Sequence, residues 1–378
     1  MKNLKFEISN LKSVARPARR PLPQVFCLLL TAYCLLPTAY FLLPAAHAAA
    51  WGRQKSGTFA WLHAVFFVDE RRGWAAGGKG ALLSTADGGA TWEVRKSPTE
   101  DAVRDLFFHD AETGWMLCER SIFKPVEKEE SVSYLLKTAD GGRTWSRVEV
   151  TRGADVDLKL AGLRFADGEH GWVFGEMGAL FVTADGGATW VRQRVPTRHV
   201  LLSASFLDAQ LGWLSGGGLT VLKTTDGGAT WRAGTVFLPA SGAEGQQPEP
   251  KVNAPGADPR RQEAARRFSR RLNAVWFADH ESGWAVGSGG VIISTADGGR
   301  TWRPQVSGVG DDLFDVKFFD AREGWAVGSG GAMLHTTDGG RTWADEKRVT
   351  THALERLFFV GRRAWAVGFG GTVVASQG

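Results

Sequence analysis

Tyrosine and cysteine are scarce in this sequence. Its 378 residues include only 3 Tyr and 3 Cys, and one of each, Tyr134 and Cys118, lies beyond residue 48. A lone cysteine cannot form an intrachain disulfide, so the stability of this part of the chain must come from packing. A lone tyrosine argues against a sialidase, whose mechanism needs a tyrosine nucleophile.

The histidines also lack the spacing of a metal site. No H-x-x-x-H pair and no Cys/His cluster occurs anywhere in the sequence. We therefore expect no metal and no other cofactor.

The first 48 residues have the composition of an export signal. A basic segment ends at Arg20, an apolar stretch runs from about Val25 to Leu43, and Ala46-His47-Ala48 forms a small-x-small cleavage site. We expect residues 1–48 to be a secretory signal peptide, and the protein to act in the periplasm, the thylakoid lumen or the extracellular space. The alternative is an uncleaved anchor helix, although prolines interrupt the apolar run.

The excess of basic over acidic residues lies entirely within residues 1–48. The full sequence carries 45 Lys and Arg against 40 Asp and Glu, a formal net charge of +5. Residues 1–48 contain six of the basic residues and one acid, so 39 residues of each sign remain in 49–378. A neutral remainder gives no reason to expect a nucleic-acid partner.

Glycine and tryptophan are abundant, with 48 and 16 residues, and they recur in a unit of about 41 residues. Each unit contains a Gly-Trp-type pair and, in six cases, a later Ser/Thr-x-Asp-Gly-Gly-x-Thr-Trp motif. The tryptophans of the seven pairs are Trp74, Trp115, Trp172, Trp213, Trp284, Trp325 and Trp365. Each unit reads as four short strands separated by glycine-rich turns, which is typical of a propeller blade.

The sequence thus predicts an all-β, seven-bladed β-propeller over residues 49–378, with four-stranded antiparallel blades. The last unit ends at Gly378 without a fourth strand. The segment that begins Trp51-Gly-Arg-Gln resembles the fourth strand that begins Trp302-Arg-Pro-Gln. We expect residues 50–56 to complete the last blade beside 371–376, because this closes the ring and removes an open edge.

The repeated acidic motif is the Asp-box, and its aspartates invite a catalytic interpretation. Six equivalent copies around a ring cannot converge on one site, so we favour a structural role. An aspartate at a tight turn accepts hydrogen bonds from the amides that follow it, and the paired glycines adopt positive φ. The six are Asp87, Asp140, Asp185, Asp226, Asp297 and Asp338.

Strand order separates the two ends of the ring. The turns between strands one and two, and the Asp-boxes between strands three and four, share one end, which we call the Asp-box face. The turns between strands two and three share the other end with the links between blades. Two insertions, 119–133 and 238–270, fall on this second end, which we call the insertion face. Loops added to a rigid scaffold commonly carry recognition.

The starts of the innermost strands carry several charged residues. We expect a channel-mouth binding patch on the insertion face, formed by Arg104, Arg198, Arg271 and Arg356. Ordinary solvated strand ends are the alternative. The arginine-rich end of the 238–270 insertion could likewise contact an acidic partner or be a solvated loop.

The repeated unit resembles that of the photosystem II stability/assembly factor family. Residues 283–302 and 324–343 match its Gly-Trp-Ala-Val-Gly and Asp-box pattern almost letter for letter, and the likeness covers about 50–378. The resemblance implies an exported, non-enzymatic propeller, here expected to be a monomer close to a membrane. It implies that an arginine-rich patch docks membrane-protein subunits or their lumenal or periplasmic segments. The alternative is a carbohydrate-active Asp-box propeller, either a glycan-binding module or a glycoside hydrolase that uses Asp105 and Asp315.

Overall fold

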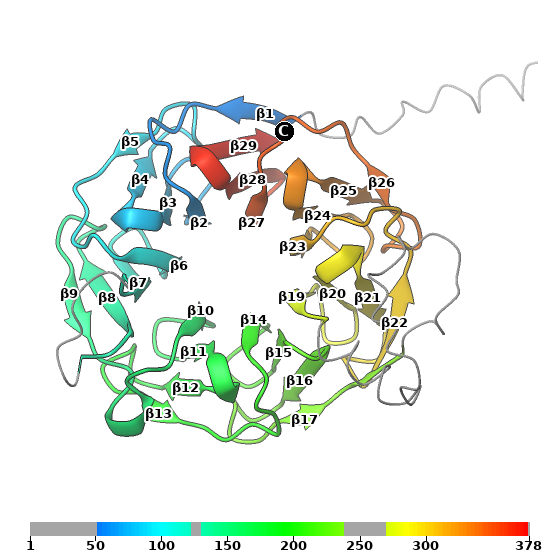
Figure 1. Ribbon diagram of the computed structural model, residues 1–378, viewed down its shortest axis with the longest axis horizontal. Coiled ribbons are helices and arrows are strands. Elements are labelled where there is room, and N and C mark those ends of the chain that lie inside the picture. Colours follow the sequence, from blue (N-terminus) through cyan, green and yellow to red (C-terminus); the bar gives the residue numbers. More distant parts are fainter. Residues whose placement is uncertain (1–50, 122–129, 238–269, 377–378) are drawn as a thin grey trace, which may run out of the picture. The chain divides into compact units, whose positions relative to one another are not determined.

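Seven small sheets follow one another along the chain and form the blades of a propeller (Figure 1). The computed structural model describes residues 51–121, 130–237 and 270–376, all within the unit Ala49–Gly378. The expected signal peptide lies outside the described residues, as do 122–129 and 238–269 of the two insertions. The predicted fold class is confirmed.

The strands of each blade are given from the innermost to the outermost. Blade 1 is β2 (Leu62–Phe67), β3 (Gly73–Gly77), β4 (Leu82–Thr85) and β5 (Glu93–Val94); blade 2 is β6 (Ala102–Phe108), β7 (Thr113–Glu119), β8 (Ser133–Ala139) and β9 (Ser146–Val148). Blade 3 is β10 (Leu160–Phe165), β11 (Gly171–Gly175), β12 (Leu180–Thr183) and β13 (Val191–Arg192); blade 4 is β14 (Leu201–Phe206), β15 (Gly212–Gly216), β16 (Thr220–Thr224) and β17 (Arg232–Ala233). Blade 5 is β19 (Leu272–Phe277), β20 (Gly283–Gly287), β21 (Ile292–Thr295) and β22 (Thr301–Gln305); blade 6 is β23 (Leu313–Phe318), β24 (Gly324–Gly328), β25 (Met333–Thr336) and β26 (Ala344–Asp345). Blade 7 is β27 (Leu354–Val360), β28 (Arg363–Gly368), β29 (Thr372–Ser376) and β1 (Trp51–Gln54).

Short 3-10 turns occur on the insertion face, most of them between strands two and three. They are η2 (Gly78–Gly80), η4 (Glu176–Gly178), η5 (Ser288–Gly290), η6 (Ser329–Gly331) and η7 (Phe369–Gly371), with η3 (Gly153–Asp155) in the link before blade 3. Within the described residues no helix is long and apolar enough to cross a membrane.

The first described strand closes the ring. β1 pairs antiparallel with β29 over four residues, from Trp51 opposite Ser376 to Gln54 opposite Val373. The innermost strands β2, β6, β10, β14, β19, β23 and β27 contact one another in cyclic order, and β27 returns to β2. Closing the last blade with the N-terminal strand was expected from the sequence and is confirmed.

One strand was not expected. After β17 the chain forms β18 (Thr235–Val236), which pairs in parallel with β22 and makes blade 5 a five-stranded sheet. The amide of Thr235 donates to Arg300 O, and the amide of Phe237 donates to Trp302 O. The link therefore leaves blade 4 by covering the open outer edge of blade 5, which satisfies backbone groups that an edge strand would expose.

The core lies between the blades, where a phenylalanine is sandwiched between a glycine and a tryptophan. In blade 5 a Cβ on Gly283 would come within 2.5 Å of the Phe277 ring, so only glycine leaves room for it. The opposite face of Phe277 stacks on Trp213 of blade 4, with ring centroids 3.5 Å apart. This arrangement explains the Gly-Trp pair, because each glycine admits a ring that the tryptophan of the preceding blade covers.

Blade 7 departs from this pattern. Ala364 takes the place of the glycine, and Phe359 stacks on Phe319 instead of the preceding tryptophan. That tryptophan, Trp325, packs edge-on against Trp51 of β1, with ring centroids 5.3 Å apart. The closing strand thus supplies an aromatic contact that the other interfaces obtain from phenylalanine.

Candidate functional site

The Asp-box aspartates are fully engaged within their own turns. In blade 1, Asp87 Oδ1 accepts from the amide of Thr91 at 2.9 Å and from Thr85 Oγ1 at 2.8 Å, while its Oδ2 accepts from Thr91 Oγ1 at 2.6 Å. The hydroxyl and amide of Thr91 lower the pKa of Asp87 to about 2. The other five aspartates have the same threonine partners and also have a pKa of about 2.

The Asp-boxes of blades 1, 4, 5 and 6 also join neighbouring blades. In blade 5 the amide of Gly298 donates to Glu281 O in the turn between strands one and two. The carbonyl of Gly298 accepts from Trp213 Nε1 of blade 4 at 3.0 Å. Trp172, Trp284 and Trp365 make the same bond to the next blade. These contacts give the motif a scaffold role.

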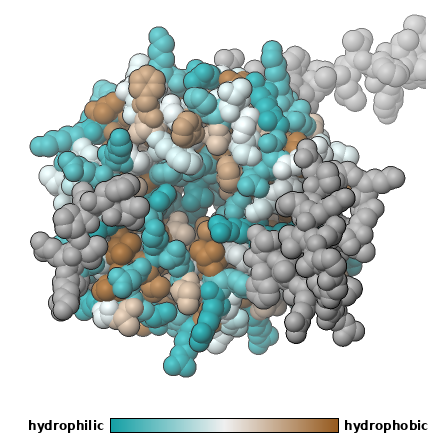
Figure 2. All heavy atoms as spheres, viewed as in Figure 1, coloured by the Kyte–Doolittle hydropathy of each residue, from teal (hydrophilic) through white to brown (hydrophobic). Residues whose placement is uncertain are grey.

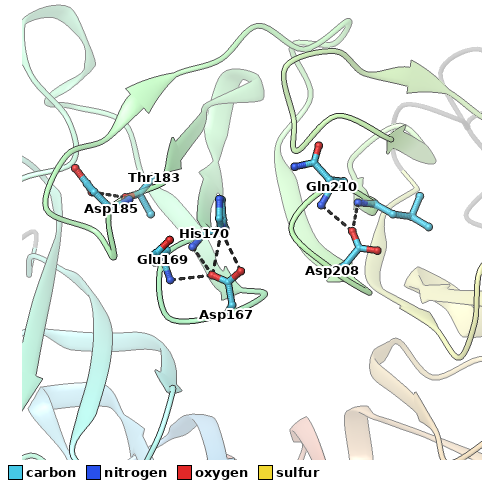
Figure 3. Close-up of polar contacts among 8 residues, drawn as sticks. Asp167, Glu169, His170, Thr183, Asp185, Asp208 and Gln210 are labelled. Atoms are coloured by element: carbon cyan, nitrogen blue, oxygen red, sulfur yellow. Dashed lines mark hydrogen bonds and ion pairs between the residues drawn. The ribbon is translucent and has the colours of Figure 1, made fainter.

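A second series of aspartates holds the turns between strands one and two. Figure 3 shows two of them in blades 3 and 4, where Asp167 and Asp208 accept hydrogen bonds from the amides two and three residues ahead. The full series is Asp69, Asp110, Asp167, Asp208, Asp279 and Asp320. Sequence reasoning missed this series, although an aspartate follows the first strand of six units.

The four predicted patch residues divide between two places. Arg198 and Arg271 are exposed in the links just before β14 and β19, on the insertion face. Arg104 lies on β6, where its Nε donates to Glu119 Oε2 at 2.7 Å. Arg356 lies inside the channel, where it lines a cavity with residues of other blades. Three of the positions therefore lie toward the insertion face, at blades 2, 4 and 5, and Arg356 lies in the channel.

An aromatic cluster at the junction of blades 7 and 1 adds to the insertion face. Trp61, in the link before β2, packs edge-on against Phe369 of η7, with ring centroids 5.3 Å apart. His63 lies against Trp61 and His352 against Phe369, at 5.3 and 5.6 Å. Trp61 is 43% exposed, Phe369 48%, and nearby Phe59 95%. We call Trp61, His63, His352 and Phe369 the aromatic cluster; the sequence analysis did not single it out.

A second apolar side chain on this face is held in an unusual backbone conformation. Met177 of η4 has φ 57° and is 59% exposed. Glycine occupies the corresponding position of η5, η6 and η7. Positive φ disfavours residues that carry a side chain, so the backbone conformation of Met177 has a local energetic cost that glycine would avoid.

The channel contains charged residues that sequence reasoning only partly identified. Asp105 accepts from Arg164 Nη1 at 2.7 Å and from the amides of Leu106 and Leu163, each at 3.0 Å. Asp315 accepts from the amides of its neighbour and of Leu357, both at 2.9 Å. Both carboxylates are buried and occupied by donors, which does not favour their use as a hydrolase pair.

The tyrosine that a sialidase mechanism would require is also buried and hydrogen-bonded. Tyr134 is 4% exposed, and its hydroxyl donates to Asp101 Oδ2 at 2.8 Å. Burial raises the pKa of Tyr134, so the phenolate that a sialidase uses is disfavoured. Among the described residues, no group of three or more His, Cys, Asp or Glu is placed to hold a metal ion.

Comparison with known families identifies a related family. The family model for photosynthesis system II assembly factor YCF48 matches residues 43–150, 96–196 and 262–353, which is more than half of the chain. A search of curated proteins found no match.

Several solved structures share the fold. The structure of YCF48 bound to D1 peptide is 20% identical, with a TM-score of 0.65, covering 88% of this chain and 96% of that one. YCF48 from Cyanidioschyzon merolae is 22% identical, with a TM-score of 0.63, covering 87% and 99%. Virginiamycin B lyase from Staphylococcus aureus is 9% identical, with a TM-score of 0.64, covering 86% and 98%. An enzyme and assembly factors therefore share this scaffold. At such low sequence identity, the similarity of these structures supports the fold and not a function.

Proposed function

The chain belongs to the photosynthesis system II assembly factor YCF48 family, and from this premise we propose that it is a non-enzymatic assembly factor that binds a segment of a membrane-protein subunit. A solved YCF48 is bound to a D1 peptide, which supports a protein segment of this kind as the partner. We place the binding site on the insertion face.

The aromatic cluster is the observation that supports a binding site on the insertion face. Large aromatic side chains that remain exposed on a rigid surface are the commonest anchors of protein interfaces. Trp61 and Phe369 are each more than two-fifths exposed although they pack on one another. Arg198 and Arg271 are exposed on the same face, and arginine adds bidentate contacts to carboxylates and backbone. A segment that combines apolar and acidic residues fits this surface.

We further propose that the chain is exported and works beside a membrane. The basic residues up to Arg20, the apolar stretch and Ala46-His47-Ala48 support this proposal. Mass spectrometry of the N-terminus from fractionated cells tests it. Cleavage near Ala48 in an extracytoplasmic fraction is expected, and a full-length cytoplasmic chain would contradict export without affecting the binding proposal.

Binding is tested with synthetic peptides that cover the segments of D1 outside the membrane. Trp61→Ala and Phe369→Ala should each lower the affinity for the bound peptide by about tenfold, as expected when an interface anchor is removed. Charge reversal at Arg198 or Arg271 should weaken it and make the remaining binding less sensitive to salt. Val94→Ala and Arg232→Glu are matched controls, because both residues are exposed on outermost strands.

The controls decide between binding at this face and binding elsewhere. If the control variants lose as much affinity as the cluster variants, the insertion face is not the site. If no D1 peptide binds, a co-purification from solubilised membranes with the same variants decides whether another membrane-protein segment is the partner. Recovery of the same proteins by wild type and by Trp61→Ala would refute the proposal.

A further inference from the structure

The central channel contains a cavity of ≈ 390 Å3, within the size range of small-molecule sites. It is lined by the later residues of the innermost strands and by Gly361, in the turn between strands one and two of blade 7. It therefore lies toward the Asp-box face, away from the aromatic cluster. Figure 2 shows the central hollow of the ring from outside.

The charges that line this cavity do not balance. Three cationic side chains, Arg164, Lys317 and Arg356, face two carboxylates, those of Asp105 and Asp315. Asp105 is taken up by Arg164 and two backbone amides, and Asp315 by two backbone amides. Among the lining residues one positive charge is therefore in excess, beside Lys317 and Arg356. Glu355, outside the lining, also acts on Arg356, but its carboxylate is paired with His63 at 2.7 Å.

Two donors in the same cavity are buried without an acceptor. Arg356 Nε and Trp276 Nε1 have no hydrogen-bond partner among the described residues. The ammonium of Lys317 stands 4.1 Å from the centroid of the Trp276 ring, which brings a third donor beside them. A buried polar group without a partner costs about 1–3 kcal/mol. Both of the unpaired groups in this cavity are donors, so a negatively charged acceptor would stabilise them.

The rest of the wall is apolar and aromatic. Phe66, Phe107, Phe206 and Phe358 come from four different innermost strands. Bare inorganic anions are strongly hydrated and would gain nothing from such walls, whereas an apolar body gains from leaving water.

We propose that the channel is a binding site for a small-molecule carboxylate with an apolar or aromatic body. The carboxylate accepts from Arg356 Nε and Trp276 Nε1 and neutralises the charge of Lys317, while its body packs on the phenylalanines. The site is separate from the insertion face, so it can fail without affecting the proposed function.

Burial lowers the pKa of Lys317 to about 8. A bound carboxylate would favour the charged ammonium and raise this pKa. Binding should therefore be accompanied by proton uptake when measured just above pH 8, because part of the free protein has lost the Lys317 proton there. Asp105, Asp315, Arg164 and Arg356 are the other charged groups that act on Lys317.

Phenylacetate is a suitable probe for isothermal titration calorimetry on the full protein. We expect binding with one site per chain. Lys317→Met and Trp276→Phe should each weaken it, Lys317→Met by about tenfold or more because a charge-assisted hydrogen bond is lost. Arg356→Gln should do the same. Trp276→Phe keeps the cavity lined by an aromatic ring and removes only one donor, so it remains informative if a charge variant fails to fold.

Two controls separate this site from unspecific binding. Lys223→Met removes a lysine that also stands over a tryptophan, Trp213 at 5.3 Å, outside the channel, and should leave affinity unchanged. Phenylacetamide has the same shape without the charge and should bind at least about tenfold more weakly. Equal binding of the acid and the amide, or equal loss in the Lys223 and Lys317 variants, would overturn the proposal, as would the absence of binding by phenylacetate.

Discussion

The hydrogen bond from a blade's tryptophan to the carbonyl of the next Asp-box should make a measurable contribution to stability, because four interfaces have it and the interface between blades 2 and 3 does not. Trp213 and Trp115 are both buried and both stack on a phenylalanine of the next blade, at 3.5 and 4.3 Å. Trp213 Nε1 donates to Gly298 O, whereas Trp115 Nε1 has no partner among the described residues. The acceptor that Trp115 would use, Gly186 O, receives Lys137 Nζ at 2.8 Å.

Replacing each tryptophan by phenylalanine removes the same volume, so the packing costs largely cancel in the difference. Trp213→Phe also leaves a buried carbonyl without its donor, which costs about 1–3 kcal/mol, while Trp115→Phe removes a donor that was unsatisfied. The free energy of unfolding should therefore fall by about 1–3 kcal/mol more in Trp213→Phe. Urea unfolding followed by circular dichroism measures the difference at equal m-values. An equal loss in both variants would refute the role assigned to the Asp-box carbonyl.

Three other predictions concern the ring. Trp51→Ala should lower the free energy of unfolding by about 2 kcal/mol, since a half-buried aromatic contact with Trp325 is lost; no change in the urea midpoint would mean that β1 does not hold the ring. Gly283→Ala should destabilise by about 1–3 kcal/mol through the clash with Phe277, and thermal melting that matches wild type would disprove the sandwich. The six Asp-box aspartates have a pKa of about 2 when folded against 3.8 otherwise, so their stabilisation is complete above about pH 4 and is lost as pH falls toward 2; denaturation midpoints that stay constant over that range would contradict it.

Most of the fold could be predicted because the same two motifs recur in nearly every blade. The Gly-Trp pair and the Asp-box fix where each blade begins and turns, and the likeness of Trp51 to Trp302 disclosed the closing strand. β18 could not be predicted in this way. Its two residues carry no repeated signal, and they form a strand only because β22 offers an open edge beside them.

The candidate site was harder to predict than the fold. Arg104, Arg198 and Arg271 lie toward the expected face. Arg356 instead lines the channel, because it takes the strand position that Asp105 and Asp315 hold in blades 2 and 6. Lys317 and Arg164 were missed, since each lies among apolar residues of its own strand. Only ring closure brings the two strands to the same cavity. The aromatic cluster was missed because Trp61 and Phe369 are 308 residues apart in sequence.

The central claim is that the insertion face, and not the Asp-box face, receives a membrane-protein segment. Hydrogen–deuterium exchange of the protein with and without a bound D1 peptide tests it most directly. Binding should slow exchange in the links and turns that hold Trp61, His352 and Phe369, and leave the Asp-box turns unchanged. Protection confined to the Asp-box turns or to the outermost strands would contradict the claim.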